Sequence, residues 1–101
     1  MKRINKVFLV AVFGLAVSLG TAKVYAATVN VDGGTWDYGY TRPINAYSKY
    51  YHSYNNHGSK VVNVNNGITA ISNAEAGIWS NAVIGTIWDP ATFYYNPTGY
   101  Y

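Results

Sequence analysis

The chain has 101 residues, a hydrophobic content of 50%, no cysteine and a formal net charge of +3. This length suits one small domain, and the absence of cysteine excludes a disulfide-stapled core. Four of the seven basic residues precede residue 27, and the rest of the chain carries three basic and four acidic residues, a net charge of −1. That balance argues against nucleic-acid binding and electrostatic membrane disruption, because both need clustered Lys and Arg.

The first 26 residues have the pattern of an export signal. Three basic residues supply the positive start: Lys2, Arg3 and Lys6. Val7 to Leu19 is an uncharged, mostly apolar run, and Val24-Tyr25-Ala26 fits the small-x-small cleavage rule. The run is short for a membrane span, which needs roughly twenty apolar residues, so an uncleaved anchor is the weaker alternative. We expect cleavage after Ala26 or Ala27 and a secreted, extracellular mature segment, residues 27–101.

The mature segment is predicted to be all-β, with five or six short strands. Trp36, Tyr38 and Tyr40 alternate with other residues, which places three rings on one face of an extended segment. Ala46 to Tyr54 is rich in tyrosine, which favours strands. Asn55-Asn56-His57-Gly58 is typical of a turn.

The middle of the chain reads as a hairpin. Lys60 to Asn65 is predicted to be a strand with Val62 and Val64 on one face. Asn65-Asn66-Gly67 predicts a type I′ turn, because Asn-Gly tolerates the two positive φ angles that this turn requires. Ile68 to Ser72 is the expected return strand.

The segment Asn73 to Gly85 is ambiguous. Three residues recur at helical spacing and three others alternate as in a strand: Ala74, Ile78 and Ala82, then Trp79, Asn81 and Val83. Gly77 would cost a helix roughly 1 kcal/mol, so we predict a strand. Ile87 to Pro90 is expected to be a connecting segment, with Trp88 as a candidate core residue. It leads to a last predicted strand at Thr92 to Asn96. The predicted fold class is a small antiparallel β-sandwich.

Tyr47 to Lys60 is the candidate binding stretch, since these fourteen residues hold four tyrosines, both histidines and two lysines. Tyrosine has an apolar face and a polar tip, so such a surface suits recognition. The alternative is that these rings only pair across a sheet. The candidate ligand-binding residues are Trp36, Tyr47, Tyr50, Tyr51, His52, Tyr54, His57 and Lys60.

The same residues do not suggest catalysis. There is no cysteine, and neither His52 nor His57 has a carboxylate nearby in the sequence, so no acid–base pair or activated nucleophile is indicated. The histidine spacing matches no metal motif. We expect no enzyme, metal or cofactor, and ordinary surface or turn positions for the histidines are the alternative to ligand contact. Rings with Asn and Ser side chains suit a sugar or lipid headgroup, and Arg42, Lys49 and Lys60 could meet a phosphate.

Short blocks spread over most of the mature segment carry a family resemblance. They are Gly34-Thr35-Trp36, Gly39-Tyr40, Ala46-Tyr47-Ser48, His57-Gly58-Ser59-Lys60, Val64-Asn65-Asn66, Ala76-Gly77-Ile78-Trp79 and Phe93-Tyr94-Tyr95-Asn96. In this order they resemble the lactococcin 972 family of exported, unmodified bacteriocins. The resemblance implies a signal-bearing precursor, a small β-sandwich, and killing of related Gram-positive bacteria by binding lipid II and blocking septum formation without pores. Pro97 to Tyr101 extends past the family pattern.

The resemblance also implies partners. These are lipid II or another cell-wall precursor of the target bacteria, and an immunity or export transporter of the Gram-positive producer. Self-association is left open because a domain this small has little interior. Two other classes fit the composition: a secreted carbohydrate-binding or cell-surface β module without killing activity, and a self-assembling surface protein with cross-β strands.

Overall fold

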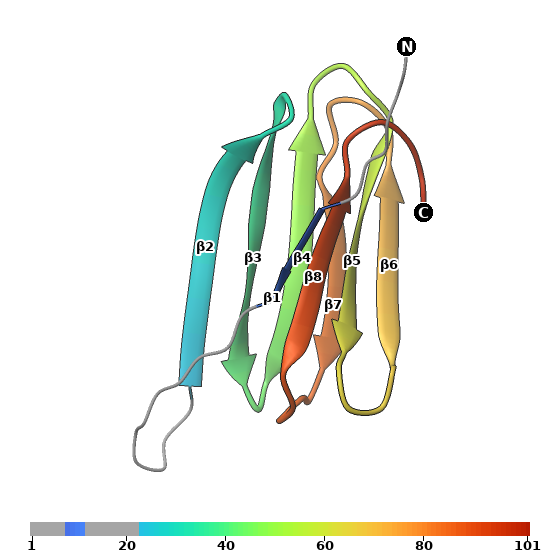
Figure 1. The fold of residues 1–101 in the computed structure, drawn as a ribbon. Helices are drawn as coiled ribbons and strands as arrows, with labels where there is room; N and C mark the ends of the chain where they lie inside the picture. Colours follow the sequence, from blue (N-terminus) through green and yellow to red (C-terminus); the bar gives the residue numbers. More distant parts are fainter. Residues whose placement is uncertain (1–7, 12–22) are drawn as a thin grey trace.

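The computed structural model of this protein describes residues 8–11 and 23–101. In these ranges, eight strands make two four-stranded antiparallel sheets that pack face to face (Figure 1). The strands are β1 (Phe8–Ala11), β2 (Lys23–Val31), β3 (Gly34–Arg42), β4 (Asn45–His52), β5 (His57–Asn63), β6 (Thr69–Ala74), β7 (Ser80–Gly85) and β8 (Ala91–Asn96). The predicted all-β sandwich is confirmed. Nowhere in the described ranges is there a helix long and apolar enough to cross a membrane.

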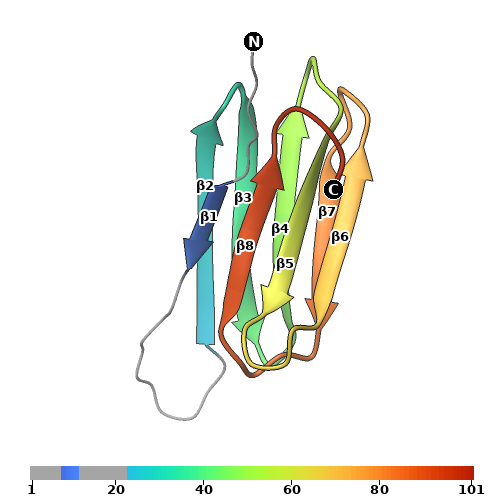
Figure 2. The same ribbon diagram turned by 45° about the vertical axis from the view of Figure 1, so that its right-hand side comes forward.

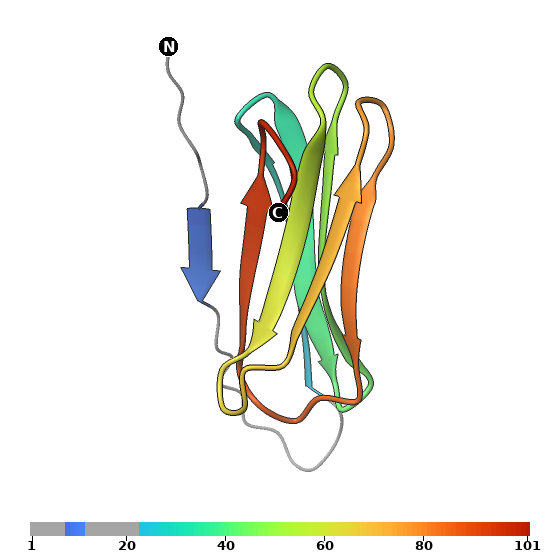
Figure 3. The same cartoon turned by 90° about the vertical axis from the view of Figure 1, so that its right-hand side faces the viewer.

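The chain passes several times between the two sheets, whose strand orders are β1-β8-β5-β6 and β2-β3-β4-β7. Strands β2, β3 and β4 form consecutive hairpins, β5 and β6 form a hairpin in the other sheet, and β7 returns to pair with β4. Strand β8 then pairs with β5. The turned view in Figure 2 shows β8, β5 and β6 as one layer. Figure 3 shows β6 and β7 side by side at one edge, where the Asn81 amide donates to Ser72 Oγ at 2.9 Å.

Aromatic rings from both sheets fill the space between them. Trp36, Tyr38 and Tyr40 share one face of β3, as predicted, and this face points inward, so that none is more than 6% exposed. The Trp36 ring lies 4.1 Å from the Tyr38 ring and 4.6 Å from the Tyr95 ring, measured between centroids. Tyr50 stacks on Tyr95 at 4.9 Å. Each buried ring removes roughly 150 to 250 Å² from water, so rings supply the core that a cysteine-free small domain needs.

Hydroxyl groups satisfy the polar atoms that this core buries. Trp36 Nε1 donates to Ser48 Oγ at 2.9 Å, and that hydroxyl donates to the Tyr94 carbonyl oxygen of the opposite sheet at 2.8 Å. The hydroxyls of Ser59 and Ser80 lie 2.8 Å apart, again between the sheets. Because a buried polar group without a partner destabilises the fold, these contacts explain the inward serines.

The tight hairpin turn lies between β2 and β3, where the sequence analysis predicted none. Asp32 and Gly33 have φ values of 52° and 82°, and Val31 pairs with Gly34. Two positive φ angles in a two-residue loop are what a type I′ turn requires, and Asp-Gly is among the pairs that favour it. The type I′ geometry therefore belongs to Asp32-Gly33.

The hairpin predicted at Asn66-Gly67 forms between β5 and β6, but the predicted turn type is wrong. Residues 64–68 make the loop, in which Gly67 has a positive φ of 78° and Asn66 does not. The Gly67 amide donates to the Asn63 carbonyl oxygen at 2.8 Å, and Asn63 Oδ1 accepts the Asn65 amide at 2.9 Å. The Asn63 side chain thus stabilises a wider loop.

Strand β5 begins inside the predicted turn. His57 and Gly58 already belong to the strand, so the predicted turn Asn55 to Gly58 is correct only in its first half. Val62 faces outward and Val64 lies in the following loop, which corrects their predicted shared face. Val61 is the valine that fills the core, because alternation from the buried His57 turns it inward.

The ambiguous segment Asn73 to Gly85 contains no helix. Strand pairing was the correct prediction, but a turn divides the segment between β6 and β7, with Gly77 at a φ of 85°. The predicted core role of Trp88 is wrong, since Trp88 is 69% exposed and its neighbour Ile87 is 2% exposed. In this connection between β7 and β8, Ile87 rather than Trp88 enters the core.

Most of the expected export signal lies outside the described residues, including Lys2, Arg3 and Lys6. Within the described part, Phe8–Ala11 pairs with β8. Lys23 to Ala26 form the first half of β2, and Ala27 to Val31 complete it, although no strand was predicted there. Cleavage after Ala26 or Ala27 stays a prediction.

Candidate functional site

The fold divides the Tyr47–Lys60 stretch between four environments: the core, the outer side of β4, the following loop and the outer side of β5. Successive residues of β4 point alternately into the core and out to solvent. Of the predicted residues, Trp36, Tyr50, His52 and His57 are buried; Tyr47 and Tyr51 face outward from β4; Tyr54 is in the following loop; and Lys60 is on the outer side of β5. The structure therefore does not bring these eight residues onto one surface.

A polar and aromatic surface instead covers the outer side of the β2-β3-β4-β7 sheet. Strand register places Asp37 opposite Lys49, and Lys49 opposite Asn81. The Tyr51 ring lies 5.5 Å from the ring of Trp79, which is 47% exposed. We call this surface the tyrosine–tryptophan face and define it by Asp37, Tyr47, Lys49, Tyr51, Trp79 and Asn81.

Three members of this face were missed from the sequence: Asp37, Trp79 and Asn81. Trp79 and Asn81 belong to an alternating pattern that was recognised, but the pattern does not reveal that β7 pairs with β4. That pairing joins residues about thirty positions apart, such as Lys49 and Asn81. A local pattern carries no information about such a partner.

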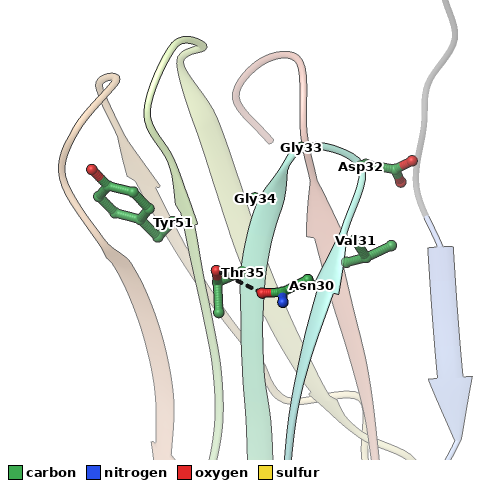
Figure 4. A pocket seen from close by; sticks show the side chains of 7 residues that line it. All are labelled: Asn30, Val31, Asp32, Gly33, Gly34, Thr35 and Tyr51. Carbon is green, nitrogen blue, oxygen red and sulfur yellow. Dashed lines mark hydrogen bonds between the residues drawn. The ribbon is translucent and has the colours of Figure 1, made fainter.

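Two shallow pockets lie on this side of the sheet. One, of about 240 Å³, is lined by Asp37, Lys49, Trp79 and Asn81. The other, of about 390 Å³, lies between Tyr51 and the β2-β3 turn, and its lining residues are Asn30, Val31, Asp32, Gly33, Gly34, Thr35 and Tyr51. Figure 4 shows Thr35 and Asn30 hydrogen-bonded beside this pocket, with the Tyr51 ring set apart from them. The two pockets flank the Tyr51–Trp79 ring pair.

The face carries both signs of charge at close range. The Lys49 ammonium lies 5.3 Å from the centre of the Tyr47 ring, and Thr28 Oγ1 donates to Asp37 Oδ1 at 3.3 Å. Burial, and secondarily the negative charge of Asp37, raises the pKa of the Tyr47 hydroxyl. Tyr47 is thus a neutral hydrogen-bonding group at physiological pH, beside one cation and one anion.

The two buried histidines shape the loops at this end of the sandwich. His57 Nδ1 is 2.8 Å from the Asn55 carbonyl oxygen, and His57 Nε2 is 2.8 Å from the Ile78 carbonyl oxygen. The His52 carbonyl oxygen accepts the Gly77 amide at 2.9 Å. These bonds hold the turn that precedes Trp79, so the histidines position the tyrosine–tryptophan face from beneath.

His52 also has a defined protonation state. Its Nδ1 accepts the amides of Tyr54 and Asn55 at 3.1 Å each, which requires an unprotonated nitrogen. Burial lowers the pKa of His52, a hydrogen bond donated by its ring to the backbone of Asp32 opposes the shift, and the charge of His57 adds to the lowering. His52 therefore acts as a structural acceptor. Instead of the ordinary surface or turn positions given as the alternative, both histidines have buried positions at the strand ends on either side of the turn.

The three cations that follow residue 26 are kept apart. The Arg42 guanidinium lies 4.2 Å from the Tyr40 ring centre, Lys49 is at Tyr47, and the Lys60 ammonium is 4.6 Å from the Tyr94 ring centre on the opposite sheet. Each therefore rests on a tyrosine ring of its own strand or its neighbour. In residues 27–101, the positive charge forms no cluster. The described ranges also contain no group of three or more His, Asp or Glu side chains that could hold a metal ion.

Comparison with known proteins gives consistent results. A bacteriocin family, lactococcin 972, matches residues 32–95. The solved structure of lactococcin 972 is 41% identical, with a TM-score of 0.55, and the alignment covers 62% of this chain and 96% of that chain. No curated protein matches the sequence. The matched residues include strands β3 to β7, most of β8, and all six residues of the tyrosine–tryptophan face. The chain therefore belongs to the lactococcin 972 family of bacteriocins.

Proposed function

We propose that this chain is secreted and inhibits related Gram-positive bacteria by binding lipid II, which blocks septum and cell-wall synthesis without pore formation. Membership of the bacteriocin family supports the inhibitory role. The observation that carries the binding step is the tyrosine–tryptophan face, where the outward-facing Tyr51–Trp79 ring pair lies between two pockets. We place lipid II on this face.

The chemistry of the face fits an amino sugar attached to a pyrophosphate. Flat rings such as Tyr51 and Trp79 pack on the apolar faces of sugars. Lys49 can meet a phosphate oxygen, and the amide of Asn81 and the hydroxyl of Tyr47 can donate or accept hydrogen bonds. A single lysine suits recognition of one headgroup rather than adsorption to a charged surface.

The dispersed cations support a mode of action that does not depend on membrane charge. Adsorption to anionic bilayers gains about 1 kcal/mol for each basic residue near the surface, so it needs several together. Arg42, Lys49 and Lys60 lie on three different strands. The proposed action is therefore binding without catalysis and without bulk attack on the bilayer. We also propose an export or immunity transporter of the producer as a partner of this chain.

Growth and septum assays on sensitive Gram-positive cells test this function with the secreted protein. We expect growth inhibition with defective septa, and added lipid II should protect the cells. Liposomes without lipid II should retain a trapped dye at the inhibitory concentration. Dye release at that concentration, or no protection by lipid II, would contradict the proposal. Binding to finished peptidoglycan without growth inhibition would instead support a carbohydrate-binding module.

A matched pair of tryptophans tests the face itself. Trp79→Ala should weaken lipid II binding by roughly 1 to 3 kcal/mol, the range for an exposed ring at the centre of an interface. Trp88 is also exposed but lies in the β7–β8 connection, away from the ring pair, so Trp88→Ala should leave binding unchanged. Equal losses in both variants would show that the tyrosine–tryptophan face is not the site.

A further inference from the structure

The last residues of the chain dock onto the sheet opposite the tyrosine–tryptophan face. After β8, the chain turns back over β5 and β6, and Figures 1 and 2 both show its end beside these strands. The Tyr101 amide donates to Asn73 Oδ1 at 2.9 Å, and Asn73 Nδ2 donates to the Tyr101 carbonyl oxygen at 3.4 Å. One side chain thus pairs with both the N–H and the carbonyl oxygen of one residue.

The Tyr101 ring rests in a socket with a glycine floor. Gly58 lies on the outer side of β5 yet is buried, and a Cβ added there would lie 3.0 Å from the Tyr101 ring and 2.5 Å from Asn73 Oδ1. The Lys60 ammonium lies 5.0 Å from the Tyr101 ring centre and 4.6 Å from the Tyr94 ring centre. We define this socket by Gly58, Lys60, Asn73 and Tyr94.

Two features indicate that the tail is a displaceable occupant. The Tyr101 hydroxyl is shielded from solvent and has no hydrogen-bond partner among the described residues. When the tail docks, this hydroxyl therefore loses its hydrogen bonds to water and gains none from the protein, which weakens docking. The family match ends at residue 95, so the socket lies within the family region and Tyr101 lies outside it. The socket residues thus belong to the family region, whereas the Tyr101 that occupies the socket belongs to the segment after it.

We propose that the socket is a second binding site, for an acidic N-acetylated amino sugar, and that Tyr101 gates it by occupying it. The docked tail shows the chemistry that fits: a flat ring over Gly58, an N–H donor at Asn73 Oδ1, and a cation at the rim. A pyranose ring can take the place of the phenol, and the N–H of an acetamido group can take the place of the Tyr101 N–H at Asn73 Oδ1. In the described ranges, Lys60 faces two rings rather than a carboxylate, so an anionic substituent would complete its contacts.

The test titrates N-acetylmuramic acid into the labelled secreted protein and follows amide resonances by NMR. If the tail is docked about nine-tenths of the time, removing the plug should tighten the apparent Kd about tenfold. Tyr101→Ala is the plug variant. Tyr100→Ala is the matched control, because Tyr100 is the exposed neighbouring tyrosine and should leave the Kd unchanged. Shifts should centre on Gly58, Lys60 and Asn73.

Two further arms identify the ligand chemistry. In the Tyr101→Ala background, Lys60→Met should weaken binding of N-acetylmuramic acid but not of neutral N-acetylglucosamine, and glucosamine, which lacks the acetyl group, should bind more weakly than either. An unchanged Kd in Tyr101→Ala, or shifts confined to the tyrosine–tryptophan face, would overturn the proposal. So would binding of a peptide with the tail sequence in place of the sugars. The choice of sugar rests on the proposed function, but lipid II protection of cells can succeed or fail independently of this titration.

Discussion

Two adjacent tyrosines of β4 show how differently the two sides of one strand are used. Tyr50 is fully buried, stacks on Tyr95 and donates its hydroxyl hydrogen to the Val31 carbonyl oxygen at 2.9 Å. Tyr51 points the opposite way, is partly exposed, and pairs with the exposed ring of Trp79. The same residue type therefore supplies core packing at one position and a recognition surface at the next. Pleat direction, rather than composition, decides which role a tyrosine has.

The largest expected effect comes from the inward ring. Tyr50→Ala should lower the free energy of unfolding by about 3 to 5 kcal/mol, because it empties a large site in a packed core. Tyr50→Phe keeps the ring and loses one hydrogen bond, so it should cost only about 0.5 to 1.5 kcal/mol. Chemical denaturation followed by tryptophan fluorescence measures both. A Tyr50→Ala variant as stable as Tyr50→Phe would mean that the ring does not pack as described.

The outward ring should show the opposite profile. Tyr51→Ala should weaken lipid II binding by roughly 1 to 3 kcal/mol while changing the free energy of unfolding far less than Tyr50→Ala does. Calorimetric titration and denaturation of the same preparation separate the two quantities. If Tyr51→Ala loses stability but keeps its affinity, the ring is structural and the binding face must be sought elsewhere.

The glycines of two hairpin turns differ in whether a buried side chain lies next to them. Gly33 and Gly67 both have positive φ, so Ala should cost each about 1 to 2 kcal/mol of stability. A Cβ at Gly33 would lie 2.9 Å from Nε2 of the buried His52, whereas one at Gly67 meets nothing within 4 Å. Gly33→Ala should therefore destabilise more than Gly67→Ala in thermal unfolding. Equal losses would indicate that backbone strain alone sets both effects.

The fold could be predicted from the sequence where neighbouring residues decide it. Alternation correctly placed Trp36, Tyr38 and Tyr40 on one face, and the structure shows that this face is the inward one, which corrects the ligand-binding role predicted for Trp36. Asn-Gly found a hairpin but the wrong turn type, because the Asn63 side chain stabilises a wider loop that the dipeptide does not reveal. The equivalent signal at Asp32-Gly33 was present in the sequence and was overlooked.

The candidate site was less predictable because it depends on pairing between distant strands. Grouping tyrosines and histidines by proximity in the sequence joined Tyr50 and His52 to Tyr47 and Tyr51, although the pleat separates them. Trp79 was omitted because only the β4–β7 pairing brings it to Tyr51. The composition of a stretch predicts that a binding surface can exist, whereas strand register decides which residues share it.

The smallest expected effect concerns His52, the last inward residue of β4. Its pKa is lowered in the folded protein, chiefly by burial, so the unfolded chain binds a proton more readily. The free energy of unfolding should therefore be unaffected by His52 well above pH 6.5, the ordinary value, and should fall as the pH drops below it until the folded-state pKa is passed. Protonation would also remove the acceptor for the Tyr54 and Asn55 amides.

An NMR titration of the two histidine rings, together with denaturation at several pH values, measures this effect. The His52 ring should titrate with a midpoint below 6.5, and His52→Asn should flatten the fall in stability towards acid pH relative to the unmodified protein. The two rings lie 6.5 Å apart, so each resonance needs its own assignment before the midpoints are compared. A His52 midpoint at or above 6.5 would show that the inward side of β4 is more hydrated at this end than at Tyr50. The difference in solvent exposure between the two sides of β4 would then become smaller towards the loop that follows it.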